Sequence, residues 1–161
     1  MHQLAALLAE SGLDARLDGA CEQAVAVPAA PRLLDDPAAP GRLVVGGGAL
    51  RLEPIAGTGT AQAVRTAILA AAVIGSAARA GGPYQDRCRG HYRARLRHVC
   101  HGHVLTCARL YAEAFATPDW ADELDAMRRV LRVPAPAPTG LRLVAGDGAP
   151  GAPVLQAAPA D

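Results

Sequence analysis

The sequence predicts an α/β fold whose C-terminal part is mainly helical. Residues 42–45 (RLVV) are apolar and partly β-branched, which favours a strand. A glycine-rich stretch follows, and the alanine-rich residues 60–79 then predict a long helix, because alanine has the highest helix propensity and only Gly75 interrupts the run. Two further helical patterns occupy residues 84–131.

The remaining segments of the chain also have patterns typical of helices and strands. Leucines at helical spacing near the start predict a short first helix, and residues 24–27 could form a strand. Of the two helical patterns in the C-terminal part, the first covers residues 84–115. The second covers residues 120–131, with Pro118 near its first turn, where proline is tolerated.

Length and composition favour one folded portion followed by a tail. A chain of 161 residues is long enough for one domain with its own core. Residues 1–132 are interpreted as that portion, and residues 133–161, rich in proline, glycine and alanine, as a linker and tail. Within this tail, residues 134–140 are expected to be the linker, residues 141–146 could form a short strand, and most of residues 146–161 is expected to be disordered.

Composition excludes several kinds of chemistry. All 16 basic residues are arginine, so no lysine can form a Schiff base or complete a Walker phosphate loop. The net charge of +1 argues neither for nor against a nucleic-acid partner. The N-terminus has no basic leader, and the longest uncharged apolar stretch, residues 66–78, is too short to span a bilayer, so we expect a cytoplasmic protein with no membrane partner. In that compartment the four cysteines are expected to be reduced: Cys21, Cys88, Cys100 and Cys107.

The glycine-rich stretch, residues 46–60 (GGGALRLEPIAGTGT), is the first candidate for a binding site. It matches a dinucleotide fingerprint poorly, because Gln62 stands in place of the third glycine. It does lead into the N-terminus of a long helix, whose first amides have no partner within the helix and favour negative charge. Gly57 and Gly59 would let a flat ligand approach the backbone. The alternative is that the glycines only turn the chain and a threonine caps the helix.

Residues 27–74 resemble a conserved block of FAD-dependent monooxygenases of the glutathione-reductase-like fold, and look closest to the tryptophan-halogenase-like branch. In that family a strand ends in Gly-Asp-Ala-Ala and is followed by Asp-Pro-x-Ser-Gly-x-Gly and a helix. Here GGGAL and EPIAGTGT stand at these places. The ending LYAEAFATPDW is similar to the branch's C-terminal helices, so the resemblance covers about residues 24–132.

The resemblance implies a partial FAD-binding fold with FAD as the cofactor. One part of the stretch would lie along the ribityl chain and the other beside the flavin ring. The implied FAD-binding residues are Gly46 and Gly47 for the first part, and Pro54, Gly57, Thr58, Gly59 and Thr60 for the second. Gly47 stands where the family has an aspartate that accepts a ribityl hydroxyl.

The implied activity is that of a fragment of an FAD-dependent oxidoreductase or monooxygenase, which oxygenates or halogenates a small organic substrate through reduced flavin. In the family, a strand, G-x-G-x-x-G and a helix hold the ADP half of FAD, and this pattern does not occur before residue 42. The implied partner is therefore a separate N-terminal FAD-binding half. A reductase is the other implied partner. The sequence identifies no catalytic residue. The alternative is a non-enzymatic helical module that binds a partner chain.

Cysteines and histidines gather in residues 88–107, which raises the question of a metal. Cys100, His103 and Cys107 share one helical face, but three ligands on one helix make a poor zinc site. We therefore expect these side chains to pack in the core and no metal to bind.

The other polar side chains of this helix are expected to be solvated. His91, His98 and His101 fall on the side away from that face. The arginines scatter around the helix axis, which favours a solvated surface over a nucleic-acid interface. They are Arg87, Arg89, Arg93, Arg95 and Arg97.

Overall fold

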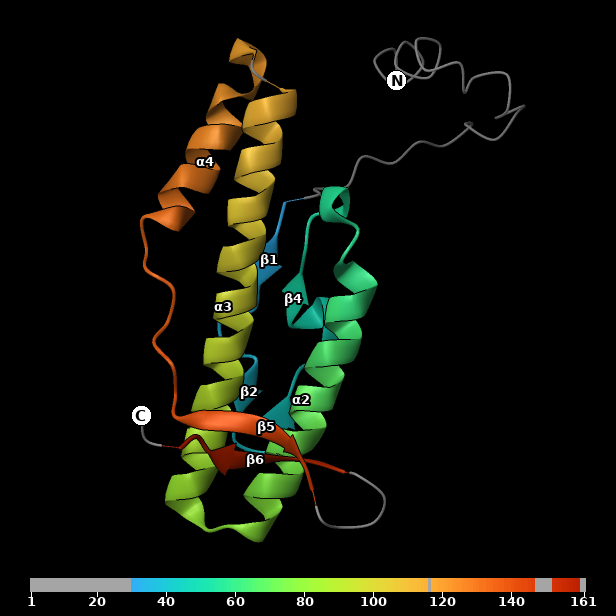
Figure 1. Ribbon diagram of the computed structural model, residues 1–161, viewed down its shortest axis with the longest axis vertical. Coiled ribbons are helices and arrows are strands. Elements are labelled where there is room, and N and C mark those ends of the chain that lie inside the picture. Colours follow the sequence, from blue (N-terminus) through green and yellow to red (C-terminus); the bar gives the residue numbers. More distant parts are fainter. Residues whose placement is uncertain (1–29, 116, 147–151, 160–161) are drawn as a thin grey trace, which may run out of the picture.

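The computed structural model describes residues 30–115, 117–146 and 152–159. These residues form three α-helices and three small two-stranded antiparallel sheets (Figure 1). The fold is therefore mixed but mostly helical, and no FAD-binding fold is identified among the described residues. The short helix and the strand expected before residue 28 lie outside them.

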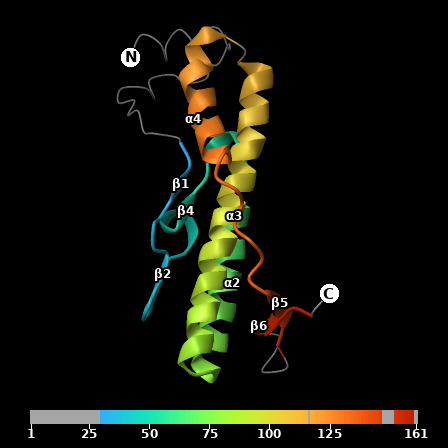
Figure 2. The same cartoon turned by 90° about the vertical axis from the view of Figure 1, so that its left-hand side faces the viewer.

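The helices lie side by side along the long axis of the molecule (Figures 1 and 2). Helix α2 (Gly59–Arg79) and helix α3 (Gly82–Ala114) form an antiparallel pair, and α4 (Ala121–Leu131) packs on the C-terminal part of α3. The expected helices over 60–79, 84–115 and 120–131 are confirmed to within two residues at each end. A 3-10 turn, Pro118–Trp120, precedes α4.

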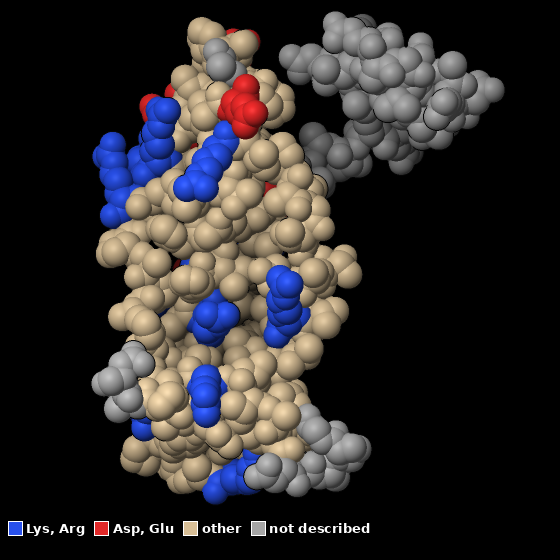
Figure 3. Space-filling model, in the orientation of Figure 1, with Lys and Arg blue, Asp and Glu red and all other residues tan. Residues whose placement is uncertain are grey.

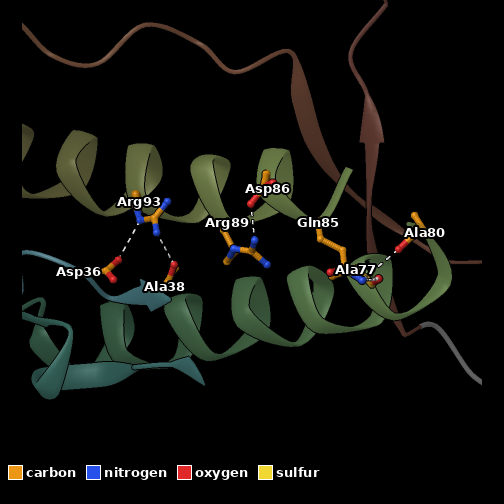
Figure 4. Close-up of polar contacts among 8 residues, drawn as sticks. All are labelled: Asp36, Ala38, Ala77, Ala80, Gln85, Asp86, Arg89 and Arg93. Atoms are coloured by element: carbon orange, nitrogen blue, oxygen red, sulfur yellow. Dashed lines mark hydrogen bonds and ion pairs between the residues drawn. The ribbon is translucent and has the colours of Figure 1, made fainter. Parts of the chain in front are cut away.

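The turn between α2 and α3 is short because α2 ends in an extended residue, Ala80, and Pro83 lies in the first turn of α3. Gln85 of α3 holds this end in place. Its Nε2 donates to the carbonyls of Ala77, at 3.1 Å, and Ala80, at 3.2 Å (Figure 4). Two carbonyls at the C-terminal end of α2 thus gain a side-chain donor, at a place where a helix leaves carbonyls without helical partners.

Two of the small sheets lie in the segment before α2. Strand β1 (Arg32–Leu33) pairs with β4 (Leu50–Arg51), and β2 (Ala38–Ala39) pairs with β3 (Arg42–Leu43). The strand expected over residues 42–45 is thus shorter than expected. Pro40 and Gly41, with φ of 70° at the glycine, make the tight turn that pairs it with β2 instead of placing it in a larger sheet.

The third sheet is formed by the tail. Strand β5 (Leu141–Ala145) pairs with β6 (Pro153–Ala157), with Leu143 opposite Leu155. The short strand expected near residues 141–146 is confirmed. The expected disorder of residues 146–161 is wrong for residues 153–157.

Strand β6 is ordered by contacts with the two long helices. Leu155 is buried, and its backbone N–H donates to Ser76 Oγ of α2 at 2.8 Å. Tyr84 of α3 donates its hydroxyl to the carbonyl of Leu155 at 2.9 Å. Residues 134–139, between α4 and β5, contain no helix or strand.

The buried apolar side chains form two clusters along α3. The first lies between α2, α3 and the strands and includes Val73, Tyr92 and Leu96. The second lies between α3 and α4 and includes Cys107 and Met127. Helix α3 is therefore the common support of the fold.

Candidate functional site

The glycine-rich stretch forms two short 3-10 turns before it enters α2. They are η2 (Gly46–Gly48) and η3 (Pro54–Ala56). Gly46 has a φ of 60° and Gly57 a φ of 62°, a left-handed conformation that side chains other than glycine disfavour. The expected bend before a long helix is present, with the helix beginning at Gly59.

The residues of this bend are held to different extents. Gly46 is half-buried against α2, and its N–H donates to Thr66 Oγ1 at 3.3 Å. Gly47 is exposed and lines a shallow hollow of about 280 Å³. The other implied flavin contacts are all exposed on the surface: Pro54, Gly57, Thr58, Gly59 and Thr60.

No side chain among the described residues caps the N-terminus of α2. Thr58 occupies the capping position, but it contributes only its carbonyl, which accepts the N–H of Gln62 at 3.0 Å. The interpretation that a threonine caps this helix is therefore wrong for Thr58. The helix N-terminus faces solvent without a side-chain acceptor.

Glu53, directly before the second turn, anchors the bend to α3. Its backbone N–H donates to Nε2 of His103 at 2.9 Å, and its carboxylate accepts the hydroxyl of Tyr111. Cys107 Sγ lies 3.3 Å from the same His103 nitrogen. We call Glu53, His103, Cys107 and Tyr111 the anchor cluster. All four residues are buried.

The environment of the anchor cluster favours the uncharged forms of its thiol and imidazole. Burial, and then the charge of Glu53, raise the pKa of Cys107 to about 11, so its thiol stays protonated at neutral pH. Burial lowers the pKa of His103 and outweighs the opposite effect of Glu53. A neutral ring is also what the geometry needs, because Nε2 accepts a hydrogen bond.

Aromatic side chains extend this cluster to the start of α4. The ring centroids of Tyr111 and Phe115 are 5.2 Å apart, and those of Phe115 and Trp120 are 4.6 Å apart. The chain has five aromatic residues, so three of them meet at this one place. They fix the turn from α3 into α4.

The expected packing of the cysteines is confirmed. Cys88 and Cys107 are buried, Cys100 is half-buried, and all three are free thiols. Among the described residues no three histidine, cysteine, aspartate or glutamate side chains converge as metal ligands.

The expectation for the histidines is correct only in part. His98 is exposed and His101 is half-buried, but His91 is only 5% exposed and contacts Thr139 Oγ1 through Nδ1. His91 was expected in solvent because the helical pattern cannot show that residues 139–143 return to cover that side of α3.

The arginines of α3 scatter around the helix, but the expectation that they are solvated is correct only for Arg87, Arg95 and Arg97, since Arg89 and Arg93 are half-buried. Arg93 Nε pairs with Asp36 at 3.0 Å, and the same side chain donates to the carbonyl of Ala38 (Figure 4). Arg89 pairs with Asp86, and Arg87 lies 5.9 Å from the ring centroid of Tyr84. Arg93 thus ties the β2–β3 hairpin to α3.

Sequence reasoning missed the anchor cluster as a unit. The one available signal was Glu53, a lone acidic residue within an apolar and glycine-rich stretch, since a buried carboxylate needs donors. Its partners His103 and Tyr111 lie 50 and 58 positions away, and no spacing rule connects them.

Comparisons of the chain with protein-family models, with curated proteins and with solved structures found no match. The resemblance to FAD-dependent monooxygenases, and FAD as cofactor, therefore stay predictions.

Proposed function

We propose that the chain is a helical module that binds a partner protein through the outer face of α2. This proposal is based on one observation: the side of α2 that turns away from α3 exposes apolar side chains from residue 61 to residue 78, with Thr60 and Arg79 at its two ends. Val64 is 55% exposed, Ile68 44% and Ile74 58%. The residues of this outer face are Ala61, Val64, Ala67, Ile68, Ala71, Ile74 and Ala78.

The outer face is continuous and long enough for a helix to pack against. At 100° per residue its members fall within about 140° of the helix circumference, and they extend over about 25 Å. The buried residues of α2, such as Leu69 and Val73, lie on the opposite side. Contiguous apolar surface of this kind is typical of interaction sites.

Small side chains shape this face for close contact. Ala67, Ala71 and Gly75 follow at intervals of four and form a row of small residues, beside the larger Val64 and Ile74. Such a row lets a second helix approach closely, as small residues do at helix interfaces. The expected occupant is therefore a helix of a partner protein.

A lipid bilayer is a less suitable occupant, although α2 is long and apolar enough to cross a membrane by length and composition alone. Helix α3 runs beside α2 and has exposed Arg95 and Arg97 at its middle. Burying such arginines in hydrocarbon is costly. That a membrane is not a partner stays a prediction, as does a cytoplasmic location.

Site-specific crosslinking tests the proposal. We would place a photo-crosslinking residue at Ala71 in the tagged chain, with Leu105, an exposed apolar position of α3, as the matched control. A discrete product at position 71 that is lost with Ile74→Glu, and absent at position 105, supports the module. Equal products at both positions, or none at 71 in the native cell, contradict it.

A flavin site at the bend is the second candidate, and it would make the chain a fragment of an FAD-dependent oxidoreductase or monooxygenase. The observation that favours it is the bend itself, where left-handed Gly57 leads to the uncapped N-terminus of α2. Exposed backbone at such a place can receive an anionic ligand atom.

The described residues do not fit FAD on their own. The residues expected beside the ring are all exposed, and Gly47 offers no carboxylate for a ribityl hydroxyl. Glu53, the nearest acidic residue in sequence, is turned inward to Tyr111. A separate chain with the ADP-binding half, or a reductase, would have to enclose the flavin and a small organic substrate.

A titration with FAD, followed by flavin fluorescence, tests the second candidate. Gly47→Asp restores the carboxylate of the family pattern and should tighten binding, whereas Gly81→Asp, at the other end of α2, is the control and should leave it unchanged. If neither the parent chain nor the Gly47→Asp variant binds FAD saturably, the bend no longer supports a flavin site.

A further inference from the structure

A groove beside the outer face of α2 has the features of a ligand site. It has a volume of about 570 Å³ and lies between α2, α3 and β5. This volume is within the range of small-molecule pockets, about 300–1,000 Å³. In Figure 3, basic side chains border a hollow in the middle of this face, where α2, α3 and β5 meet in Figure 1.

The walls of the groove are apolar. Leu69 of α2, Leu96 and Val99 of α3, and Leu141 and Leu143 of β5 contribute aliphatic side chains from three elements. Leu69, Leu96 and Leu141 are buried, so they form a fixed floor. No tyrosine, phenylalanine or tryptophan among the described residues lines the groove, so it has no large aromatic surface on which a base would stack.

Three arginines surround this floor, one from each element: Arg65 of α2, Arg95 of α3 and Arg142 of β5. No aspartate or glutamate among the described residues lines the groove. The ion pairs of the described residues use other arginines, namely Arg89, Arg93 and Arg128. The groove thus combines an apolar floor with a positive rim that no described carboxylate neutralises.

The groove is held in shape by a contact at its edge. His91, which also lines it, contacts Thr139 and so connects α3 to the segment that leads into β5. Burial, and then the charge of Arg95, lower the pKa of His91. Its ring is therefore neutral at pH 7, and the positive charge of the site comes from the guanidinium groups, which cannot deprotonate.

We propose that this groove binds a small amphipathic oxyanion, with a carboxylate or phosphate head on Arg65, Arg95 and Arg142 and an aliphatic body on the leucine and valine floor. The guanidinium fork matches both kinds of head in a bidentate geometry. The aliphatic floor buries the body and gains the hydrophobic free energy of its surface. The site is separate from the bend, and it adjoins the outer face of α2 at Ile68, which lines the groove as well.

Calorimetric titration of the purified chain tests the proposal. The probes are octanoate and octyl phosphate, with octanol, octylammonium and inorganic phosphate as controls that each lack one half of the ligand. We expect saturable binding, one ligand per chain, of one or both oxyanion probes. The comparison between the two identifies the head. Octanol and inorganic phosphate should bind at least tenfold more weakly, because each has only one of the two contacts.

Variants assign the binding to this groove. Arg65→Gln, Arg95→Gln and Arg142→Gln should each weaken binding about tenfold or more, since each removes a charge-assisted hydrogen bond. These side chains are exposed, and circular dichroism should show an unchanged fold. Arg97→Gln, an exposed arginine of α3 outside the groove, is the matched control and should bind as the parent chain does.

Several results would overturn the proposal. If octanol bound as tightly as octanoate, the groove would be a purely apolar site. If inorganic phosphate bound as tightly as octyl phosphate, it would be a simple anion site. The proposal would be wrong if neither oxyanion bound. It would also be wrong if the three groove variants bound the probes as tightly as the parent chain does. Co-sedimentation with phosphatidylglycerol vesicles that requires the same arginines, without binding of monomeric probes, would assign the arginines to a lipid surface instead.

Discussion

Glu53 is the residue whose environment has the clearest energetic consequence. Its backbone and its carboxylate contact two different residues of α3, so the bend is held to the long helix at two points. One carboxylate oxygen, Oε1, accepts the hydroxyl of Tyr111. The other, Oε2, is buried without a hydrogen-bond donor among the described residues. The stability of the fold therefore depends strongly on the hydrogen bond that this buried carboxylate accepts from Tyr111.

Tyr111→Phe should therefore destabilise the chain by about 1–3 kcal/mol, because it leaves Oε1 without its donor. Urea unfolding followed by the fluorescence of Trp120 would measure this loss. In a Glu53→Met background no buried carboxylate remains, and the same substitution should cost much less. Equal costs in the two backgrounds would show that Tyr111 stabilises the fold by packing alone.

The buried histidines predict a pH dependence of stability. His91 and His103 both have a pKa below the ordinary value of 6.5, mainly because burial disfavours the charged ring. The unfolded chain then binds more protons than the folded chain below about pH 6.5, so the free energy of unfolding rises with pH in that window. Stability should be higher at pH 7.5 than at pH 5.5.

The variant His103→Gln separates the two histidines. Glutamine can still accept the N–H of Glu53 but does not titrate, so the difference in the free energy of unfolding between pH 7.5 and pH 5.5 should become smaller. His98→Gln, at an exposed position, is the matched control. If the free energy of unfolding changes between pH 7.5 and pH 5.5 as much in His103→Gln as in the parent chain, His103 contributes nothing to the pH dependence.

Among the structural elements, the turn before α2 gives the sharpest comparison, since two nearby glycines have different roles. Gly57→Ala should destabilise the chain by about 1–2 kcal/mol, because Gly57 has a φ of 62°. Gly59→Ala should be neutral or stabilising by up to about 1 kcal/mol, because Gly59 starts the helix and has open space where a Cβ would lie. Thermal unfolding of the two variants would measure the contrast, and similar losses in both would be evidence against a rigid turn at Gly57.

The elements also show what the sequence could predict. The three helices were predictable because alanine content and helical spacing are local properties, and so was the bend at Gly57. The packing of Cys107 was predictable from its position on the apolar stripe of α3. The anchor cluster was not, since it depends on contacts between Glu53 and residues more than 45 positions away. The pairing of β2 with β3 was missed because two-residue strands have no alternating pattern.

For the molecule as a whole, the C-terminal hairpin joins the parts that the sequence suggested were separate. Residues 133–161 looked like a linker and tail because they are rich in proline and alanine. In the structure β6 instead packs on α2, and Leu155 lies in the main core. The backbone of Leu155 forms hydrogen bonds with the hydroxyls of Ser76 and Tyr84. Composition cannot show this, because the core that Leu155 completes is formed by residues far earlier in the chain.

Ser76→Ala tests how much this closure contributes. The substitution removes the acceptor of the buried Leu155 N–H, and we expect a loss of about 1–3 kcal/mol in the free energy of unfolding. Hydrogen exchange at residues 153–157 should become faster in the same variant. Ala78→Ser, at an exposed position of the same helix, is the control and should change neither quantity by more than about 0.5 kcal/mol. Unchanged exchange in Ser76→Ala would mean that β5, Tyr84 and the packing of Leu155 hold β6 without the hydroxyl of Ser76.

The contact between Leu155 and Ser76 also sets an order of events during synthesis. The two residues are 79 positions apart, and ribosomes add about 5–20 residues per second, so Leu155 is made roughly 4–16 seconds after Ser76. During this interval the helical pair can form, but one side of it has no cover and its apolar surface is open to other chains. A chain that terminates before β6 would leave this side uncovered, and exposed apolar surface of this kind favours aggregation.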